Sequence, residues 1–232
     1  DPSDRFGSAR ELLDVLEHRE SSSWWRGRSR ALRVETHRPL RRIRIPRDSP
    51  LHGRAEELAH LRALQDESAD GRGQVVLLVG EAGIGKTRLV DELITALCRD
   101  GVEHEFLFGG YPPGGGITAW AAYATAFREQ FGAEDLEQAL PTCLRVSSSR
   151  IRHFAALLRE EVLEDHEGEV LTEDVIQALF VQATRGLAAT RPIVLLIEDL
   201  HNAGEPGRRL FAALSRAIAG HPVLLIGTAR TG

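Results

Sequence analysis

The sequence predicts an α/β fold in which a parallel sheet is flanked by helices, and two observations lead to that prediction. Apolar runs at 75–79, 192–197 and 222–227 contain almost no polar side chains, which is typical of strands that are buried on both faces of a sheet. Segments with helical periodicity separate these runs. Strands and helices therefore alternate as the winding of a parallel sheet requires.

The N-terminal part differs from the rest in charge and periodicity. Leu12, Leu13 and Leu16 share one face of an expected helix at 9–17. Residues 18–47 then hold ten arginines and two glutamates, a local charge of +8 in a chain whose net charge is −5. Because this stretch is rich in serine and proline and has no helical period, we interpret residues 18–50 as a basic linker. Binding of nucleic acid is the alternative interpretation of its charge.

From residue 51 onward the elements can be placed one by one. An apolar stripe of Leu58, Leu61 and Leu64 predicts a helix over 56–64, which the glycines at 71 and 73 interrupt. The helices expected after the first strand cover 87–98, 118–131, 134–144, 150–163, 173–189 and 205–219. A further strand is expected at 105–108, between the first two of these helices.

Composition excludes several classes of protein. With 232 residues, 42% hydrophobic and 27% charged, the chain fits one globular domain with appended segments. It has no apolar stretch long enough to span a membrane and no signal peptide, so we expect a cytoplasmic protein that makes no membrane contact. Cys98 and Cys143 lack the spacing of a zinc site or a disulfide framework. Because methionine is absent even at position 1, we expect a piece of a longer polypeptide.

One motif carries chemistry directly. The residues that match the phosphate-loop pattern GxxxxGK[ST] are Gly80, Glu81, Ala82, Gly83, Ile84, Gly85, Lys86 and Thr87. Glycines let several backbone N–H groups approach a polyphosphate, and the following helix adds its positive N-terminus. Lys86, the only lysine among 29 basic residues, is predicted to reach the β and γ phosphates, and the hydroxyl of Thr87 is predicted to bind Mg²⁺.

Two carboxylates follow the strand at 192–197, at the end where open α/β sheets bind ligands. Glu198 and Asp199 point to opposite sides because they are neighbours on an extended chain. We assign Glu198 to the metal ion and Asp199 to the attacking water, with the reverse order as the alternative. Arg230 follows the last strand at the same edge and is a candidate sensor of the γ-phosphate.

Residues 51–232 resemble the ATPase domain of the AAA-related STAND signalling regulators, within the P-loop NTPase class. Gly53, Arg54 and Glu57 match the GRxxEL motif of that family, and Glu198 to His201 match its acidic strand end. Gly114 to Trp120 match a segment common after its second strand. The resemblance implies ATP and Mg²⁺ as ligands, Arg54 near the adenine and Arg230 as the sensor arginine.

The same resemblance implies what the chain does not contain. The family has a fifth strand, a helical lid and regulatory repeats after the position where this chain stops, so we expect an incomplete ATPase domain. Residues 202–204 read Asn-Ala-Gly where the family usually has Trp-Ala-Asp, and from this departure we expect slow hydrolysis. The single lysine also disfavours a GTPase, because the guanine-reading motif needs a lysine of its own.

The first residues resemble the closing segment of a bacterial Ser/Thr protein kinase domain. The match consists of Asp1 to Phe6 and Ser8 to Leu13, with Arg5 in the place of an arginine that pairs with a glutamate in such kinases. The implied domains are a kinase tail at 1–17, the linker at 18–50 and the ATPase at 51–232. The chain itself is not expected to be a kinase, because it has no HRD or DFG motif.

Two functions remain open on the sequence. In the first, nucleotide binding and slow hydrolysis form a switch that controls an attached output such as the kinase, with downstream regulatory domains as further intramolecular partners. In the second, the nucleotide has a structural role and the basic linker recruits DNA or a protein. A salt-dependent affinity for DNA that is lost when Arg41, Arg42 and Arg44 are replaced would favour the second.

Overall fold

The computed structural model of the chain describes Leu13 and residues 53–114, 118–132, 135–161 and 171–231. The chain divides into two compact units, Asp1–Ile45 and Pro46–Gly232. In the first unit the described residue is Leu13, which is helical and 54% exposed. The predictions of a kinase-like tail and a basic linker otherwise lie outside the described residues.

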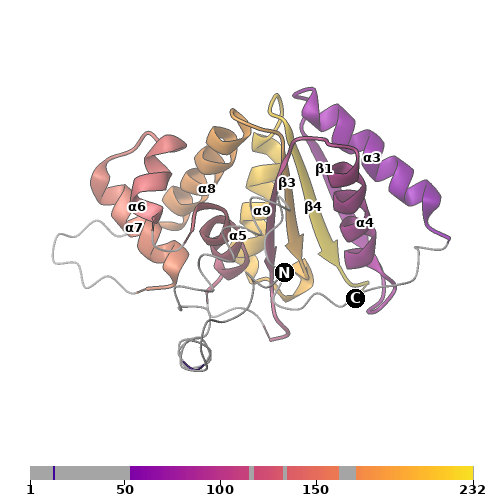
Figure 1. The fold of residues 1–232 in the computed structure, drawn as a ribbon. Helices are drawn as coiled ribbons and strands as arrows, with labels where there is room; N and C mark the ends of the chain where they lie inside the picture. The colour runs from indigo at the N-terminus through magenta and orange to yellow at the C-terminus, as the bar shows by residue number, and fades with distance from the viewer. Residues whose placement is uncertain (1–12, 14–52, 115–117, 133–134, 162–170, 232) are drawn as a thin grey trace. The chain divides into compact units, whose positions relative to one another are not determined.

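The second unit is built on a parallel sheet. Its four strands lie in the order β1-β4-β3-β2, and every pairing is parallel. The strands are β1 (Gln74–Val79), β2 (Glu105–Gly110), β3 (Ile193–Glu198) and β4 (Val223–Ala229). The α/β fold with a parallel sheet is therefore confirmed. All four carboxyl ends meet at one edge, the lower one in Figure 1.

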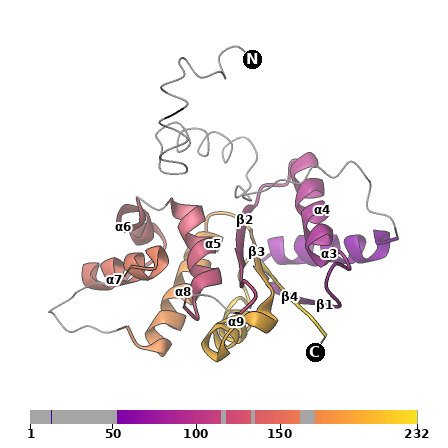
Figure 2. The same cartoon turned by 90° about the horizontal axis from the view of Figure 1, so that it is seen from below.

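Helices cover both faces of the sheet (Figure 2). On one face lie α3 (Ala55–Ala69) and α4 (Lys86–Arg99), and on the other lie α5 (Ala121–Phe131), α8 (Glu173–Ala188) and α9 (Glu205–Ala217). The shorter α6 (Leu136–Ala139) and α7 (Ser148–Arg159) pack on the outer side of α5. Single 3-10 turns, η3 (Leu140–Thr142) and η4 (Leu200–Asn202), complete the described elements.

The central strand β3 shows why the predicted strands are apolar throughout and do not alternate between apolar and polar residues. Ile193, Leu195 and Ile197 belong to the core formed with α5, α8 and α9, whereas Val194 and Leu196 belong to the core formed with α3 and α4. Successive side chains point to opposite faces of a strand, and here both faces are covered. An apolar side chain is therefore required at every position.

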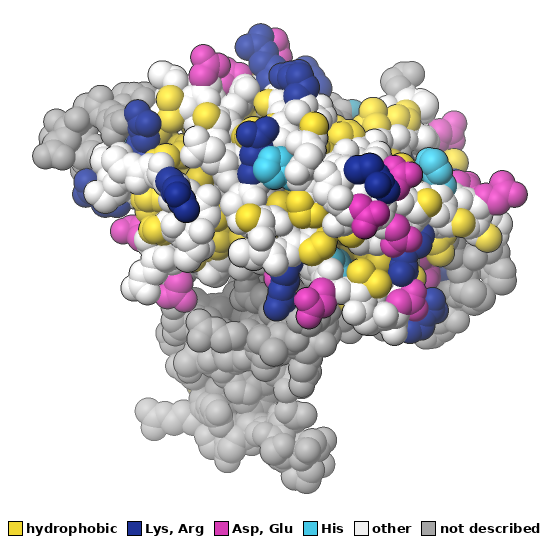
Figure 3. All heavy atoms as spheres, turned by 90° about the horizontal axis from the view of Figure 1, so that it is seen from above, with side chains coloured by type: hydrophobic (Ala, Val, Ile, Leu, Met, Phe, Trp, Pro, Cys, Tyr) yellow, Lys and Arg dark blue, Asp and Glu magenta, His cyan; other side chains and the backbone are white. Residues whose placement is uncertain are grey.

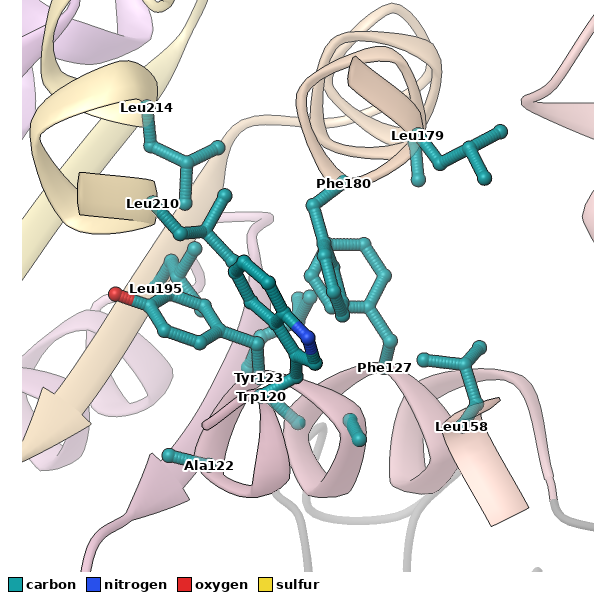
Figure 4. Packing of buried hydrophobic residues seen from close by; sticks show 14 of the residues in the cluster. Trp120, Ala122, Tyr123, Phe127, Leu158, Leu179, Phe180, Leu195, Leu210 and Leu214 are labelled. Atoms are coloured by element: carbon teal, nitrogen blue, oxygen red, sulfur yellow. The ribbon is translucent and has the colours of Figure 1, made fainter. Parts of the chain in front are cut away.

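Aromatic side chains fill the larger core around Phe180 of α8 (Figure 4). The ring of Phe180 lies 5.0 Å from Phe154, 5.4 Å from Phe127, 5.8 Å from Tyr123 and 6.4 Å from Trp120, measured between ring centroids. Tilted and edge-to-face contacts at these distances are favourable beyond the area that they bury. They join α8 to α5 and α7.

Several predicted helices differ in their limits. The helix expected over 134–144 is instead the short α6 followed by η3, because Pro141 has no N–H for an α-helical bond. The helix expected over 150–163 begins at Ser148, where Ser147 accepts the N–H of Arg150, and ends at Arg159. Glu160 then takes a left-handed conformation with φ +61°. Strands β2 and β4 each continue two residues further than predicted.

The face at the amino ends of the strands, seen in Figure 3, has a mixed surface. Acidic, basic and apolar side chains are interspersed there, without an extended patch of one charge among the coloured residues. Within the described ranges, no helix combines the length and the apolar character needed to cross a bilayer.

Candidate nucleotide-binding site

The phosphate loop connects β1 to α4 at the carboxyl edge of the sheet. Gly83 has φ +79° and Gly85, at the N-cap of α4, has φ +97°. A side chain at either position would meet open space, so it is the backbone conformation that requires glycine. The N–H of Gly80 donates to Ala229 O over 3.3 Å, which ties the start of the loop to the end of β4.

Lys86 lies inside the curve of this loop. Its Nζ donates to Gly80 O over 2.8 Å and to Glu81 O over 2.9 Å, and the residue is partly buried. Helix α4 begins at Lys86 without an acidic residue in its first turn and without a side-chain cap. The ammonium group and the positive end of the helix therefore lie together, where an anion is stabilised.

Thr87 and Glu198 are brought into contact although 111 positions separate them in the chain. The Thr87 hydroxyl donates a hydrogen bond to Glu198 Oε1, joining the first turn of α4 to the end of β3. A hydroxyl and a carboxylate are oxygen ligands of the kind that Mg²⁺ prefers. The chemistry of this donor pair fits the predicted metal, which these two residues would hold.

Asp199 faces a different set of groups. Its backbone is left-handed, with φ +54°, and its N–H donates to the Thr228 hydroxyl over 3.0 Å. Its Oδ1 lies 3.8 Å from Nδ1 of His201, and the side chain is 39% exposed. Glu198 and Asp199 thus have separate surroundings, but the reason differs from the predicted alternation along a strand. Strand β3 ends at Glu198, and the left-handed backbone of Asp199 turns the chain there.

A pocket of about 490 Å³ adjoins the phosphate loop between α3 and β1. At its rim the guanidinium of Arg54 donates to Ile84 O over 3.3 Å and to Glu57 Oε1 over 3.2 Å. The pocket is lined by Arg54, Glu56, Glu57, His60, Leu61, Val76, Leu77, Leu78, Val79, Ile84, Gly85, Lys86 and Leu89. It therefore shares Ile84, Gly85 and Lys86 with the phosphate loop.

The remaining sequence-predicted residue, Arg230, is exposed and directly follows β4 at the same edge of the sheet. Sequence reasoning missed the buried Thr228, the pocket residue His60 and the Asn202 amide, which donates to Tyr111 O over 3.4 Å. Thr228 carries a weak signal in the sequence, since it is the one hydroxyl near the end of an apolar strand. Asn202 is visible in the sequence only as part of the departure at 202–204, and His60 carries no signal, because the contact of the one and the pocket position of the other depend on neighbours distant in the chain.

A parallel sheet whose first strand runs into a glycine-rich loop and a helix, with carboxylates at the end of a strand two places along the sheet, defines the class of P-loop nucleotide-binding proteins. The AAA ATPase domain family matches residues 50–226, and the chain belongs to that family. Family membership supports nucleotide binding and ATPase activity for this domain.

Comparison with known proteins gives one curated relative and several solved structures. The relative, Uncharacterized protein R02095 of Rhizobium meliloti (strain 1021), is 28% identical over an alignment of 193 residues, and the match covers 78% of this chain and 18% of the relative. The chain thus spans under a fifth of that relative's length.

Two solved structures are similar to this chain at low identity. The Drosophila ORC bound to DNA is 14% identical with a TM-score of 0.47, covering 88% of this chain and 51% of that one. PCH-2 of C. elegans is 16% identical with a TM-score of 0.36, covering 76% and 37%.

Proposed function

We propose that the domain binds Mg·ATP at Gly80–Thr87 and hydrolyses it slowly, and that it serves as a nucleotide-controlled switch in a bacterial signalling protein of the cytoplasm. The observation that carries the proposal is the contact between Thr87 and Glu198. This contact joins the phosphate loop to the acidic end of β3. Mg-dependent phosphoryl transfer needs these two parts of the site close together.

Phosphate binding follows from the loop itself. Lys86 now donates to two loop carbonyls, Gly80 O and Glu81 O, and would exchange these for the β- and γ-phosphate oxygens. The N–H groups at the start of α4 supply further donors without competition from a side-chain cap. The cradle is thus formed by the backbone before the ligand arrives.

The pocket beside the loop is the candidate site of the base. Its walls are largely apolar, with Leu77, Val79 and Ile84 among them, and its polar rim includes the carboxylates of Glu56 and Glu57. A carboxylate accepts hydrogen bonds from the amino group of adenine and equally from the N1–H and amino group of guanine, so this rim does not select the base. Adenine is supported instead by the chain's single lysine, because the phosphate loop already uses the lysine that a guanine-reading motif would need.

For hydrolysis, we assign the attacking water to Asp199. The water oxygen forms a bond to the γ-phosphorus, the bond to the bridging oxygen breaks, ADP leaves with that electron pair, and Asp199 takes a proton from the water. Mg²⁺ held by Thr87 and Glu198 would neutralise charge on the phosphates. Arg230 would contact the γ-phosphate. Because Asp199 is 39% exposed, its electrostatic effect is weakened by solvent, which supports slow turnover.

The test measures Mg·ATP affinity and turnover of the full chain and of two variants. Lys86→Ala removes the ammonium group and is expected to weaken ATP binding at least about tenfold, a cost of about 1.4 kcal/mol. Asp199→Asn keeps the shape of the side chain but cannot accept the proton. It is expected to bind ATP normally and to lose about a hundredfold or more in kcat.

Asp66→Asn is the matched control, because Asp66 is an exposed carboxylate near the other end of α3, paired with Arg62. It is expected to leave affinity and turnover unchanged. An intact chain that does not bind ATP would contradict the proposal. Binding without turnover, unaffected by Asp199→Asn, would instead indicate a nucleotide-stabilised scaffold whose function lies in the linker.

The signalling part of the proposal is supported by residues 1–13, through their resemblance to the end of a Ser/Thr kinase domain. In the longer protein, the nucleotide state of the ATPase would control the attached kinase. Lys86→Ala in that longer protein is expected to change kinase activity without any substitution in the kinase. Kinase activity that is identical in the wild type and the variant would contradict the coupling.

A further inference from the structure

The acidic turn, defined here as Asp199 to Asn202, has a backbone conformation that needs support. Asp199 and Glu160 are the non-glycine residues with positive φ among those that the structure describes. Glu160 merely ends a helix, whereas Asp199 lies inside the site with φ +54° and ψ +45°. A left-handed conformation is unfavourable for an aspartate unless neighbouring groups hold it.

Strand β4 supplies one such group, the hydroxyl of Thr228. The last residue pair between β3 and β4 is Ile197 with Gly227, and Asp199 lies two residues beyond it. Its N–H donates to Thr228 Oγ1 over 3.0 Å, and Thr228 is only 2% exposed. A side-chain oxygen thus takes the place of the backbone acceptor that a continued strand would use.

The acidic turn also packs directly against the backbone of β4. A Cβ on Gly227 would come within 2.5 Å of Leu200 Cδ1, so Leu200 lies directly on the bare backbone of β4. The turn is closed by the N–H of Asn202, which donates to Asp199 O over 2.8 Å. The turn is therefore shaped by what β4 presents to it.

Strand β2 holds the other side of the turn. Asn202 Nδ2 donates to Tyr111 O over 3.4 Å, and the N–H of Tyr111 donates to Glu198 O over 3.1 Å. Tyr111 is itself fixed, because its hydroxyl donates to Ala119 O over 2.6 Å. Asn202 thus connects the acidic turn to the end of β2.

We infer that Thr228 and Asn202 are positioning residues, which hold the acidic turn so that the Asp199 carboxylate points at the attacking water. The inference rests on the proposed ATPase function and deepens it. In the proposed function, Lys86 and the N–H groups at the start of α4 bind the phosphates and Thr87 binds Mg²⁺, so neither Thr228 nor Asn202 is needed for nucleotide affinity. Removing either side chain therefore relaxes the turn and lowers kcat while Mg·ATP affinity is kept.

Thr228→Val is the first test, because valine keeps the branched shape and removes the acceptor. Its kcat is expected to fall about tenfold or more, with the dissociation constant of Mg·ATP unchanged within about twofold. Thr228→Ser restores the oxygen and is expected to recover most of kcat. Thr184→Val is the matched control: Thr184 is equally buried, but its hydroxyl donates to Phe180 O within α8.

Asn202→Ala tests the second contact, and the double variant tests whether the two act together. Because both residues hold one turn, their effects on kcat are expected to be non-additive, with the double variant less impaired than the product of the single effects. Independent, multiplicative losses would contradict a shared turn. A loss of ATP affinity equal to the loss of kcat would contradict a positioning role for either residue.

Hydrogen exchange at the Asp199 amide provides a readout that does not depend on activity. Thr228→Val is expected to speed this exchange by about tenfold or more, while Thr184→Val leaves it unchanged. If the wild type turns over and Thr228→Val retains both kcat and amide protection, the inference fails and the ATPase proposal stands. If the wild type neither binds nor hydrolyses ATP, the proposed function fails first.

Discussion

At the scale of single residues, burial separates reactive groups from structural ones. Burial raises the pKa of Tyr111 and of Tyr123, and their hydroxyls donate to Ala119 O and Gly207 O, so both remain neutral structural donors. Burial likewise raises the pKa of Cys143, ordinarily 9.0, to about 11. A Cβ added to Gly186 of α8 would come within 2.3 Å of the carbonyl oxygen of Cys143, so the chain at Cys143 packs tightly against α8.

The raised pKa predicts slow alkylation of Cys143. At pH 8 a thiol of pKa 11 is ionised about a hundredfold less than one of pKa 9, and the thiolate is the nucleophile. In a Cys98→Ser variant, which leaves Cys143 as the only thiol, reaction with iodoacetamide is expected to be about a hundredfold slower in the folded chain than in urea. The rate is expected to keep rising with pH until about 11.

The raised pKa of Cys143 also makes the folded state less stable at high pH. Between pH 9 and 11 the folded state keeps a proton that the unfolded state releases, so this thiol lowers the free energy of unfolding as pH rises through that window. Cys143→Ala is expected to flatten the decline over that range. Folded-state alkylation as fast as that in urea would contradict the burial of the thiol.

At the scale of elements, stability in the larger core depends on the contact of α8 with α5 and α7. Phe180 is fully buried and its ring contacts aromatic rings from both helices, as Figure 4 shows. At the start of α8, the Thr172 side chain accepts the N–H of Val175. Helix α8 leads into β3, so the position of the acidic strand end depends on this packing.

Phe180→Ala is therefore expected to lower the free energy of unfolding by about 3–5 kcal/mol, through lost burial and an unfilled cavity. Urea denaturation monitored by circular dichroism measures the change. Phe131→Ala, at the partly buried end of α5, is the matched control and is expected to cost less than half as much. Equal losses at the two positions would contradict a central role for Phe180.

At the scale of the whole described sheet, β1 occupies one edge, and the phosphate loop continues from it. Three alternate side chains of β1 are large, apolar and exposed: Val75 at 41%, Leu77 at 54% and Val79 at 53%. An uncharged apolar strand at a sheet edge is a surface on which chains self-associate. The side chains of β1 are exposed because β1 lies at the edge of the sheet. Strand β3 has a similar composition, but it lies inside the sheet and is buried.

Val75→Lys is expected to reduce self-association without loss of thermal stability, because it places a charge on the exposed side of β1. Static light scattering against protein concentration measures the effect. Val76→Lys provides the contrast, since Val76 packs against the core formed with α3 and α4 and its replacement is expected to lower the melting temperature. Association that is unchanged in Val75→Lys would exclude β1 as the contact.

Much of the fold and part of the candidate site could be predicted from the sequence because their signals are local. The apolar runs of β1, β3 and β4 and the spacing from Gly80 to Thr87 lie within short segments. Strand type, the phosphate loop and its helix follow from these segments. Helix limits near Pro141 and Glu160 were less predictable, because competing terminal signals lie within a few residues of each other.

The sequence by itself determined the kinds of groups in the site: a lysine, a hydroxyl and two carboxylates at the ends of buried elements. Only the tertiary structure decided which groups meet. Contacts between Thr87 and Glu198, between Asp199 and Thr228, and between Asn202 and Tyr111 join segments that the chain separates by 111, 29 and 91 positions. Such contacts depend on strand order and register, which arise from packing the whole sheet and leave no periodic trace in the sequence.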